Sequence, residues 1–164
     1  MQSKDEIEKW YRERDPWNYE VTKDDKQRKD TILSYLKKYG TFKRALDIGA
    51  GEGWITKDLP AKTIHGIEWS DIAANRFPRK VKRVLEPDGK YDLIIATGVL
   101  YPQYNYHQII DWIRKAHAPG GIILTSNIKE WERDLDRIGK PDFETTFQYR
   151  TYTQHLCIFS TISE

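Results

Sequence analysis

Two acidic residues and a group of glycines are the part of this sequence best suited to bind a small ligand. The segment Leu46–Gly53 reads LDIGAGEG, so Asp47 is followed by three alternating glycines. Glycines let a backbone turn sharply and approach a ligand closely, because no Cβ stands in the way. A carboxylate at this position would repel a pyrophosphate. It suits a cation such as the ammonium group of an amino acid.

Glu68 is the second acid, and it stands at the end of the next predicted strand. A carboxylate at such a strand end can accept hydrogen bonds from both hydroxyls of a ribose. The glycines follow a G-x-G-x-G spacing, whereas dinucleotide-binding proteins carry G-x-G-x-x-G. Asp47, Glu68 and this spacing therefore disfavour a nicotinamide-dependent oxidoreductase.

Short helices and strands alternate along the chain around these residues. Thr22 can cap a helix that ends near Gly40. Strands are predicted at 45–48, 63–68, 81–85, 91–96, 122–125, 143–150 and 154–162, and further helices at 54–59, 71–77, 107–117 and 128–138. Several strands are almost continuously apolar, which indicates a parallel sheet with helices on both faces. The last two strands are joined too tightly for a right-handed crossover, so one of them must run antiparallel.

The composition excludes several classes of protein. The 164 residues are 38% hydrophobic, with 27 basic and 25 acidic residues, which is enough apolar material for a core and too little basic excess for a dedicated nucleic-acid binder. No run approaches the length of a membrane span, and the N-terminus has no signal-peptide core, so a cytoplasmic protein is expected. The single cysteine, Cys157, can form neither an internal disulfide nor a cysteine-based zinc site.

The stretch from about residue 28 to 160 resembles the class I S-adenosylmethionine-dependent methyltransferases. The motifs that carry the resemblance are LDIGAGEG, GIEWS, KYDLIIATGVLY, APGGIILTSN and the terminal hairpin. It implies an α/β, three-layer Rossmann-like fold with a seven-stranded sheet in the order 3214576, strand 7 being antiparallel. It also implies S-adenosyl-L-methionine as cofactor and S-adenosyl-L-homocysteine as product. We expect one domain over 1–164, with residues 1–30 covering the cofactor site of a core at 31–164.

The resemblance also implies roles for individual residues. The methionine part of the cofactor would be held by Asp47, Gly49, Ala50 and Gly51. Glu68 would bind the ribose, and Trp69 would lie along the adenine. Thr97 and Gly98 would lie near the sulfonium. The contact to the adenine amino group stays open, since Val84, Leu85 or Glu86 could fill it.

The N-terminus is similar to a subgroup, the nodulation-factor N-methyltransferases. The similarity rests on the segment DPWNYE, on Arg28 in the first long helix, and on the stretch 99–102, which reads VLYP. By this similarity Trp17 and Arg28 would close over the cofactor, with Arg28 reaching its carboxylate. Taken without the similarity, Trp17 and Tyr19 are two large aromatics in a polar loop. They either pin the segment to the body or cover a ligand.

Methyl transfer from a sulfonium is an in-line displacement, for which an enzyme supplies alignment and a desolvated site. The candidate catalytic residues are Tyr101 and His107, beside Tyr104 and Tyr106 in the segment after the fourth strand. Histidine side chains commonly exchange protons near neutral pH, so His107 could take a proton from the acceptor, or it could be a partly exposed residue of a first helical turn. Tyr101 could equally be a packing residue.

The sequence also limits the choice of acceptor. Residues 96–100 read ATGVL and lack the N-P-P-Y element that would indicate methylation of DNA bases. No histidine or carboxylate cluster has metal-ligand spacing, so no metal is expected. The leading hypothesis is a monomeric or homodimeric enzyme that methylates a nitrogen or oxygen of a small molecule. One alternative is a protein or RNA acceptor, which only the basic run 79–83 favours. The other is a cofactor-binding module without catalysis.

Overall fold

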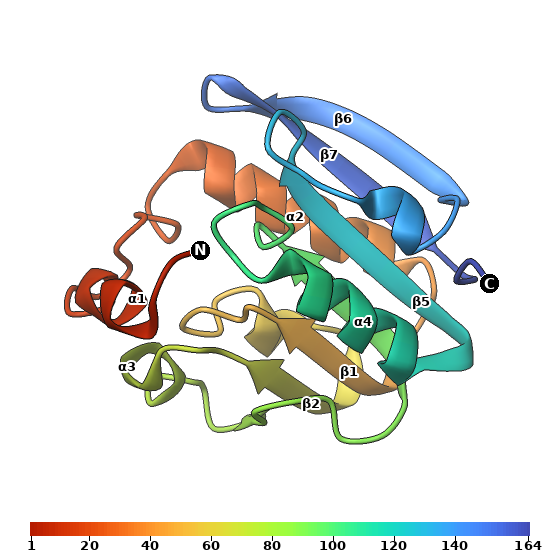
Figure 1. The fold of residues 1–164 in the computed structure, drawn as a ribbon, viewed down its shortest axis with the longest axis horizontal. Coiled ribbons are helices and arrows are strands. Elements are labelled where there is room, and N and C mark those ends of the chain that lie inside the picture. The colour runs from red at the N-terminus through yellow and green to blue at the C-terminus, as the bar shows by residue number, and fades with distance from the viewer.

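The chain forms one seven-stranded sheet with helices packed on both of its faces. Figure 1 shows the computed structural model, which describes residues 1–164. The strands are β1 (Phe42–Ile48), β2 (Ala61–Ile67), β3 (Val81–Arg83), β4 (Tyr91–Thr97), β5 (His117–Ile128), β6 (Phe143–Tyr149) and β7 (Tyr152–Phe159). Their order is β3-β2-β1-β4-β5-β7-β6, and β7 runs antiparallel to both neighbours. The order and the antiparallel strand expected from the sequence are confirmed.

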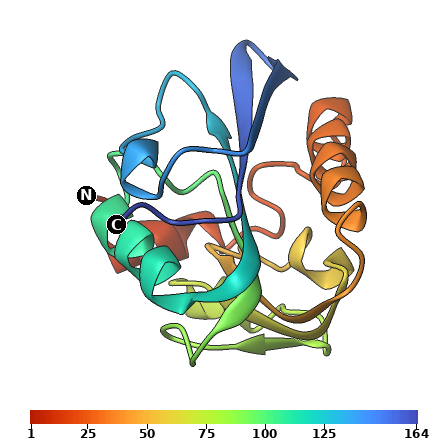
Figure 2. The ribbon, with the colours of Figure 1, turned by 90° about the vertical axis from the view of Figure 1, so that its right-hand side faces the viewer.

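Helices of unequal length cover the sheet. They are α1 (Lys4–Trp10), α2 (Lys23–Lys37), α3 (Asp71–Ala74) and α4 (Tyr106–Ala116), with 3₁₀ turns η1 (Thr56–Asp58) and η2 (Leu135–Arg137). The sheet stands between α2 on one face and α4 on the other (Figure 2). The Thr22 side chain caps α2 by accepting a hydrogen bond from the Asp25 amide, as its position suggested. None of the helices has the length and apolar content needed to cross a membrane.

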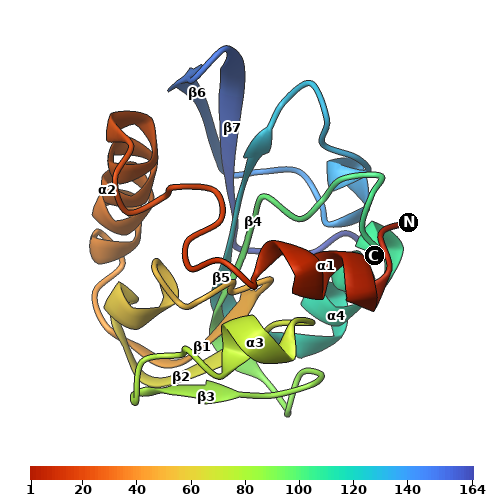
Figure 3. The ribbon, with the colours of Figure 1, turned by 90° about the vertical axis from the view of Figure 1, so that its left-hand side faces the viewer.

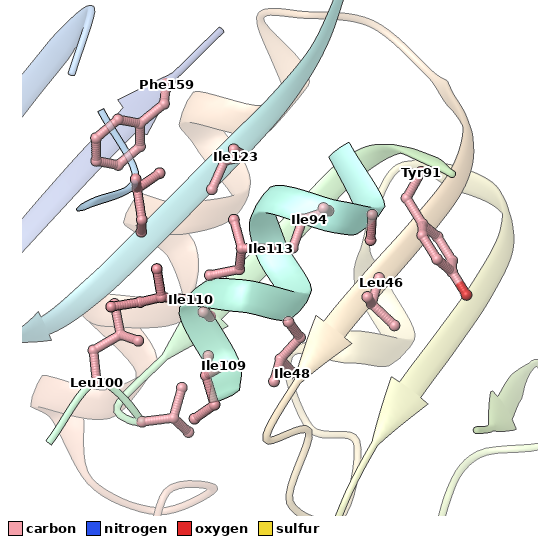
Figure 4. Close-up of a cluster of buried hydrophobic side chains, with 14 of the residues drawn as sticks. Leu46, Ile48, Tyr91, Ile94, Leu100, Ile109, Ile110, Ile113, Ile123 and Phe159 are labelled. Carbon is pink, nitrogen blue, oxygen red and sulfur yellow. The ribbon is translucent and has the colours of Figure 1, made fainter. Parts of the chain in front are cut away.

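Each face of the sheet has its own apolar cluster. Ile109, Ile110 and Ile113 line one side of α4 and are fully buried in the cluster shown in Figure 4. Neighbouring residues of β4 serve opposite faces, because side chains alternate along a strand. Ile94 belongs to the α4 cluster, and Leu93 packs in the α2 cluster. This two-sided burial makes β4 a rigid support for the loop that follows it.

The prediction of a helix at 128–138 is wrong. Strand β5 continues to Ile128, which pairs with Gln154, and the Lys129 amide then donates to the Thr153 carbonyl. The later residues form only η2, and Asp134 has a left-handed backbone with φ of 56°. Pairing with β7 thus overrides the apolar periodicity that suggested a helix, and the segment 129–142 is a loop with one short turn.

Other elements are shorter or longer than the sequence suggested. The helix expected at 54–59 is only η1, and α3 ends at Ala74, shortly before Phe77 and Pro78. A residue before proline is disfavoured in helical conformation, which is consistent with this early end. His117 opens β5 and does not end a helix, and its Nε2 donates to the Gly121 carbonyl over 2.9 Å.

The N-terminal segment lies across one end of the sheet. Strands β1, β2 and β4 are parallel, so their carboxyl ends meet at a common edge. Figure 3 shows α1 in front of this edge, with α2 and α4 on either side. Residues 11–22 connect α1 to α2 past the same edge. The topology therefore brings the loops after β1, β2 and β4 next to the first part of the chain.

Candidate functional site

A cavity of about 320 Å³ lies at the carboxyl edge of the sheet. Its walls come from the loops after β1, β2 and β4, from the N-terminal segment and α2, and from the ends of β5 and of the β6–β7 hairpin. Of the fourteen residues that the sequence suggested as site residues, twelve line it: Trp17, Tyr19, Arg28, Asp47, Gly49, Ala50, Gly51, Glu68, Trp69, Thr97, Gly98 and Tyr101.

Asp47, the last residue but one of β1, is a buried carboxylate with one free oxygen. Its side chain is 2% exposed, and Oδ2 accepts a hydrogen bond of 2.6 Å from the Thr56 hydroxyl. Oδ1 is buried without a hydrogen-bond partner. Burial raises the pKa of Asp47 to about 7, although the Thr56 hydrogen bond and the positive charge of Arg28 oppose this shift. An unpaired buried oxygen on the cavity wall is well placed to accept a hydrogen bond from a cationic ligand.

The glycine turn needs glycine for a steric reason. Gly49 has φ of 82°, and a Cβ built there would overlap the side chain of Val99 from the loop after β4. Gly51 has φ of 59° and lies against the hydroxyl of Tyr11. Side chains at these positions would strain the backbone and push the turn away from its neighbours. The close approach of three segments at one point thus depends on these two glycines.

Glu68 is held by the glycine turn. The Gly51 amide donates to Oε2 over 2.8 Å, and the Ser70 amide donates to Oε1 over 2.9 Å. The residue is 5% exposed, and burial raises the pKa of Glu68 to about 7, with the negative charge of Asp47 adding to the increase and the two amide hydrogen bonds opposing it. Each oxygen keeps capacity for a further donor, so the carboxylate can receive a pair of hydroxyls.

Arg28 places a positive charge in the cavity wall. Its Nε lies 3.5 Å from Oδ1 of Asp25, one turn earlier on α2, yet forms no hydrogen bond. Asp25 is fully buried and accepts hydrogen bonds from the Tyr149 hydroxyl (2.7 Å) and from Arg150 Nη2 (2.8 Å). The Arg28 guanidinium lies 5.1 Å from the Tyr19 ring centroid. Because Asp25 is already occupied by other donors, Arg28 retains hydrogen-bonding capacity for an anionic ligand group.

Aromatic rings form much of the remaining wall. Trp17 and Tyr19 stack with a centroid distance of 6.0 Å, and Tyr19 stacks in turn on Trp54 at 6.0 Å. Across the cavity, Trp69 and Tyr104 are parallel within 4° with centroids 6.5 Å apart. The N-terminal aromatics therefore both anchor their segment and line the cavity. Flat apolar faces of this kind suit a planar base and exclude water.

Two hydrogen bonds tie the N-terminal loop to the sheet edge. The Asp15 amide donates to Glu52 of the glycine turn over 2.6 Å. Arg150, at the tip of the β6–β7 hairpin, donates from Nη2 to the Trp17 carbonyl over 2.9 Å. The hairpin and the glycine turn, far apart in sequence, thus fix the loop that carries Trp17 and Tyr19.

Tyr101 lines the cavity, but its hydroxyl is engaged by the backbone. The Ile128 amide donates to it over 2.7 Å, and burial raises the pKa of Tyr101 well above its usual value. Asn127 supports the same loop, because its Oδ1 accepts from the amides of Val99 and Leu100. The structure thus gives Tyr101 a packing and positioning role, not that of a base.

Glu86 and His107 are not part of the cavity, which corrects two expectations. Strand β3 ends at Arg83, so Glu86 falls in an exposed turn. His107 lies in the first turn of α4 with 59% of its side chain exposed, and its Nδ1 contacts Arg137 Nη1 at 2.7 Å. His107 therefore contacts η2 and does not line the cavity.

Several cavity residues could not be inferred from local patterns. Tyr11, Trp54, and the hairpin residues Tyr149 and Arg150 line the cavity from three separate segments. Asp25 supports the site through Arg28. It is three residues before Arg28, and this helical spacing is the one sequence signal for an ion pair between them. The hairpin residues reach the site only through the placement of β7 between β5 and β6.

Residues 21–162 match the family model described as a methyltransferase domain, and the chain belongs to this family. It is an S-adenosylmethionine-dependent methyltransferase with the class I fold. No curated protein sequence matches it significantly. The family match confirms the resemblance to this class that the sequence motifs indicated.

Solved structures with the same fold include methyltransferases named for different acceptors. N-methyltransferase NodS from Bradyrhizobium japonicum, in complex with S-adenosyl-L-homocysteine, superposes with a TM-score of 0.83 at 18% identity, covering 96% of this chain and 97% of that one. Magnesium protoporphyrin IX methyltransferase from Synechocystis, with S-adenosylmethionine bound, gives 0.68 at 13% identity and 96% coverage of both chains. A putative RNA methyltransferase from Pyrococcus horikoshii gives 0.68 at 14%, covering 99% and 100%.

Proposed function

We propose that this protein transfers the methyl group of S-adenosylmethionine to a nitrogen of a small-molecule acceptor. The observation that carries the proposal is the convergence of Arg28, Asp47 and Glu68 on one aromatic-walled cavity. One cation and two carboxylates in that cavity match the carboxylate, the ammonium group and the ribose of this cofactor. NodS, which shares the fold, is an N-methyltransferase, and this supports nitrogen as the acceptor atom.

The charged residues fit the amino-acid part of the cofactor. Arg28 would pair with its carboxylate, and Oδ1 of Asp47 would accept from its ammonium group. Both Arg28 Nε and Asp47 Oδ1 are buried without hydrogen-bond partners. Unpaired buried polar atoms are costly, so they support a ligand that supplies the missing partners. Gly49, Ala50 and Gly51 would let the backbone follow this part of the ligand.

The nucleoside would lie between Glu68 and the aromatic wall. Glu68 would accept hydrogen bonds from the ribose, and the Trp69 ring would pack along the adenine. Thr97 and Gly98, at the end of β4, would border the sulfonium. Gly98 has φ of 68°, and its amide donates to the Ser126 carbonyl over 2.9 Å, which fixes this turn.

When bound, S-adenosylmethionine supplies an electrophilic methyl group on a sulfonium. The chain contributes alignment and exclusion of water through Tyr104, Trp131 and Tyr152, which line the cavity beside the loop after β4. Gln154, in the same wall, is engaged by the Ser126 hydroxyl at 2.7 Å. None of these residues is a base at neutral pH. The proposed acceptor is therefore a nitrogen that is nucleophilic without enzymatic deprotonation, such as an uncharged amine.

A turnover assay with separate acceptor classes tests the proposal. Purified protein is incubated with S-adenosylmethionine and with amino sugars, amino acids, aromatic amines and phenols, and in separate reactions with bulk RNA and with a peptide library. Formation of S-adenosyl-L-homocysteine only with small amines is the expected result. Turnover confined to phenols, RNA or peptides would overturn the choice of acceptor. Cofactor binding without turnover in any reaction would favour a non-catalytic module.

A further inference from the structure

A second group of polar side chains lies outside the cavity, where the β6–β7 hairpin meets the segment after β5. Cys157 on β7 is the register partner of Glu144 on β6, and His155 is two residues before Cys157 on the same face of β7. Glu132 reaches this group from the segment after β5. None of the four residues lines the cavity, so the group belongs to a different part of the molecule.

Three atoms that can act as metal ligands, each of different chemistry, lie close together. His155 Nε2 lies 3.0 Å from Glu144 Oε2 and 3.2 Å from Cys157 Sγ. The sulfur, nitrogen and carboxylate ligand atoms of the three residues all lie within 4.8 Å of one another. In tetrahedral zinc sites, bonds of about 2.0–2.3 Å hold ligand atoms roughly 3.5 Å apart. Sγ also lies 3.9 Å from Nδ1, so it stands beside the imidazole ring and off the Nε2 lone-pair axis, and an ion would bind with a small change in the Cys157 or His155 side-chain torsions.

Hydrogen bonds to the two ring nitrogens of His155 account for Glu132 and Glu144 but not for the nearby sulfur of Cys157. The Nε2 nitrogen of His155 carries at most one hydrogen, and Glu144 Oε2 and Cys157 Sγ cannot both receive it in good geometry. A cation between them would accept a lone pair from each of the three atoms. Cys157 is 1% exposed and His155 is 8% exposed, so two of the donors are withheld from water.

From this geometry we propose a zinc-binding site formed by Glu144 Oε2, His155 Nε2 and Cys157 Sγ. Three protein ligands of this mixed kind leave a fourth position for water, which the exposed Glu144 side makes accessible. A sulfur, an imidazole and a carboxylate together suit zinc and not magnesium or calcium, which prefer oxygen ligands alone.

Glu132 completes the site from behind. Its Oε1 contacts Nδ1 of His155, the ring nitrogen on the far side from the proposed ion. Metal-binding histidines usually donate their other N–H to a carboxylate, which fixes the ring and strengthens the ligand. The second oxygen of Glu132, Oε2, is buried without a hydrogen-bond partner. With an ion on Nε2, His155 and Glu132 would form a carboxylate–histidine–metal arrangement.

The site would stabilise one wall of the cavity. Glu132 is adjacent to Trp131, which lines the cavity and lies edge-on to Tyr101 with ring centroids 5.7 Å apart. An ion on His155 would join β6 and β7 and, through Glu132, hold the segment that carries Trp131. The inference is independent of the proposed methyl transfer, because it uses none of the residues assigned to the cofactor.

Metal titration of the untagged full chain tests the site. After treatment with a chelator, the protein is titrated with Zn²⁺ against a chromophoric chelator, and with Co²⁺ to record the thiolate-to-cobalt charge-transfer band. We expect one ion per chain, a charge-transfer band, and a higher midpoint of thermal unfolding with Zn²⁺. Cys157→Ser should abolish the band and weaken Zn²⁺ binding at least tenfold. Glu132→Gln should weaken it about 10–100-fold.

Two further variants keep the test decisive. Glu144→Gln changes an exposed residue and should weaken Zn²⁺ binding at least tenfold without loss of fold, as checked by circular dichroism. Glu130→Gln is the matched control, since Glu130 lies on the same segment but contacts only the Thr153 amide, and it should bind Zn²⁺ as the wild type does. Binding below one ion per chain in the wild type, or equal affinity and an unchanged cobalt spectrum in Cys157→Ser, would overturn the proposal.

Discussion

The Thr56 hydroxyl donates a 2.6 Å hydrogen bond to one oxygen of Asp47, and the other oxygen of this carboxylate is buried without a partner. Thr56 belongs to η1, so a short turn after the glycine loop orients Asp47 near the end of β1. The cavity wall thus contains a buried carboxylate of which only one oxygen is hydrogen-bonded. Such a group destabilises the fold and is retained where a ligand makes use of it.

The pH dependence of stability should reveal this destabilisation. Burial raises the pKa of both Asp47 and Glu68 to about 7, from 3.8 and 4.5. Between those values and pH 7 the folded state binds more protons than the unfolded state, so its stability falls as pH rises through this window. Urea denaturation from pH 4 to 8 should show a smaller decline for Asp47→Asn than for the wild type. If the unfolding free energy depends on pH equally in the two proteins, Asp47 is ionised over the whole range and its pKa is not raised.

Removing the charge of Glu68 should weaken cofactor binding. Glu68→Gln replaces charge-assisted hydrogen bonds worth about 1.5–3 kcal/mol, so the affinity for S-adenosyl-L-homocysteine should fall at least tenfold. Glu86→Gln is the control, because Glu86 lies in an exposed turn outside the cavity. Calorimetric titration of both variants measures the effect. Equal losses in the two variants, or none in Glu68→Gln, would remove Glu68 from the binding site.

Arg28 should act through the geometry of its guanidinium as well as its charge. Arg28→Lys keeps the charge but loses the planar set of donors, and should weaken S-adenosyl-L-homocysteine binding at least tenfold. A nucleoside analogue without the amino-acid carboxylate should bind the variant and the wild type alike. Lys26→Ala, an exposed change on the same helix, serves as control. If the analogue loses as much affinity as the complete ligand, Arg28 does not contact the carboxylate.

Tyr101 and His107 should contribute little to proton transfer. Tyr101→Phe removes the acceptor of the Ile128 amide, and leaving that amide unpaired should cost about 1–3 kcal/mol of stability while kcat changes by a few-fold at most. His107→Gln should leave kcat within about twofold, because His107 lies outside the cavity. Denaturation and steady-state rates measure the two effects. A loss of kcat beyond a hundredfold in either variant would restore a catalytic role.

The sequence was informative wherever one short segment carries the whole signal. Asp47 with its glycines and Glu68 are each recognisable from a strand end followed by a turn, and the strand order followed from the motifs. The polar residues that were missed depend on packing between distant segments. Asp25 meets Tyr149 only because α2 and the β6–β7 hairpin lie together.

The errors have a similar physical origin. The stretch 128–138 has apolar residues at helical intervals, but pairing of Ile128 with Gln154 extends β5 instead. The sequence predicted no metal and no cysteine-based zinc site, and the zinc site proposed above departs from that prediction because Glu144 and Cys157 become neighbours only through the register of β6 and β7. Local patterns do not carry that register.

Binding of S-adenosyl-L-homocysteine to the wild type and to Asp47→Asn, measured by calorimetric titration at neutral pH, tests the central claim most directly. We predict one site per chain in the wild type, and an affinity at least tenfold lower in the variant because Asn at this position loses the charge-assisted bond to the ligand's ammonium group. Absence of binding to the wild type at millimolar ligand, or equal affinity in the two proteins, would contradict the assignment of this cavity to the cofactor.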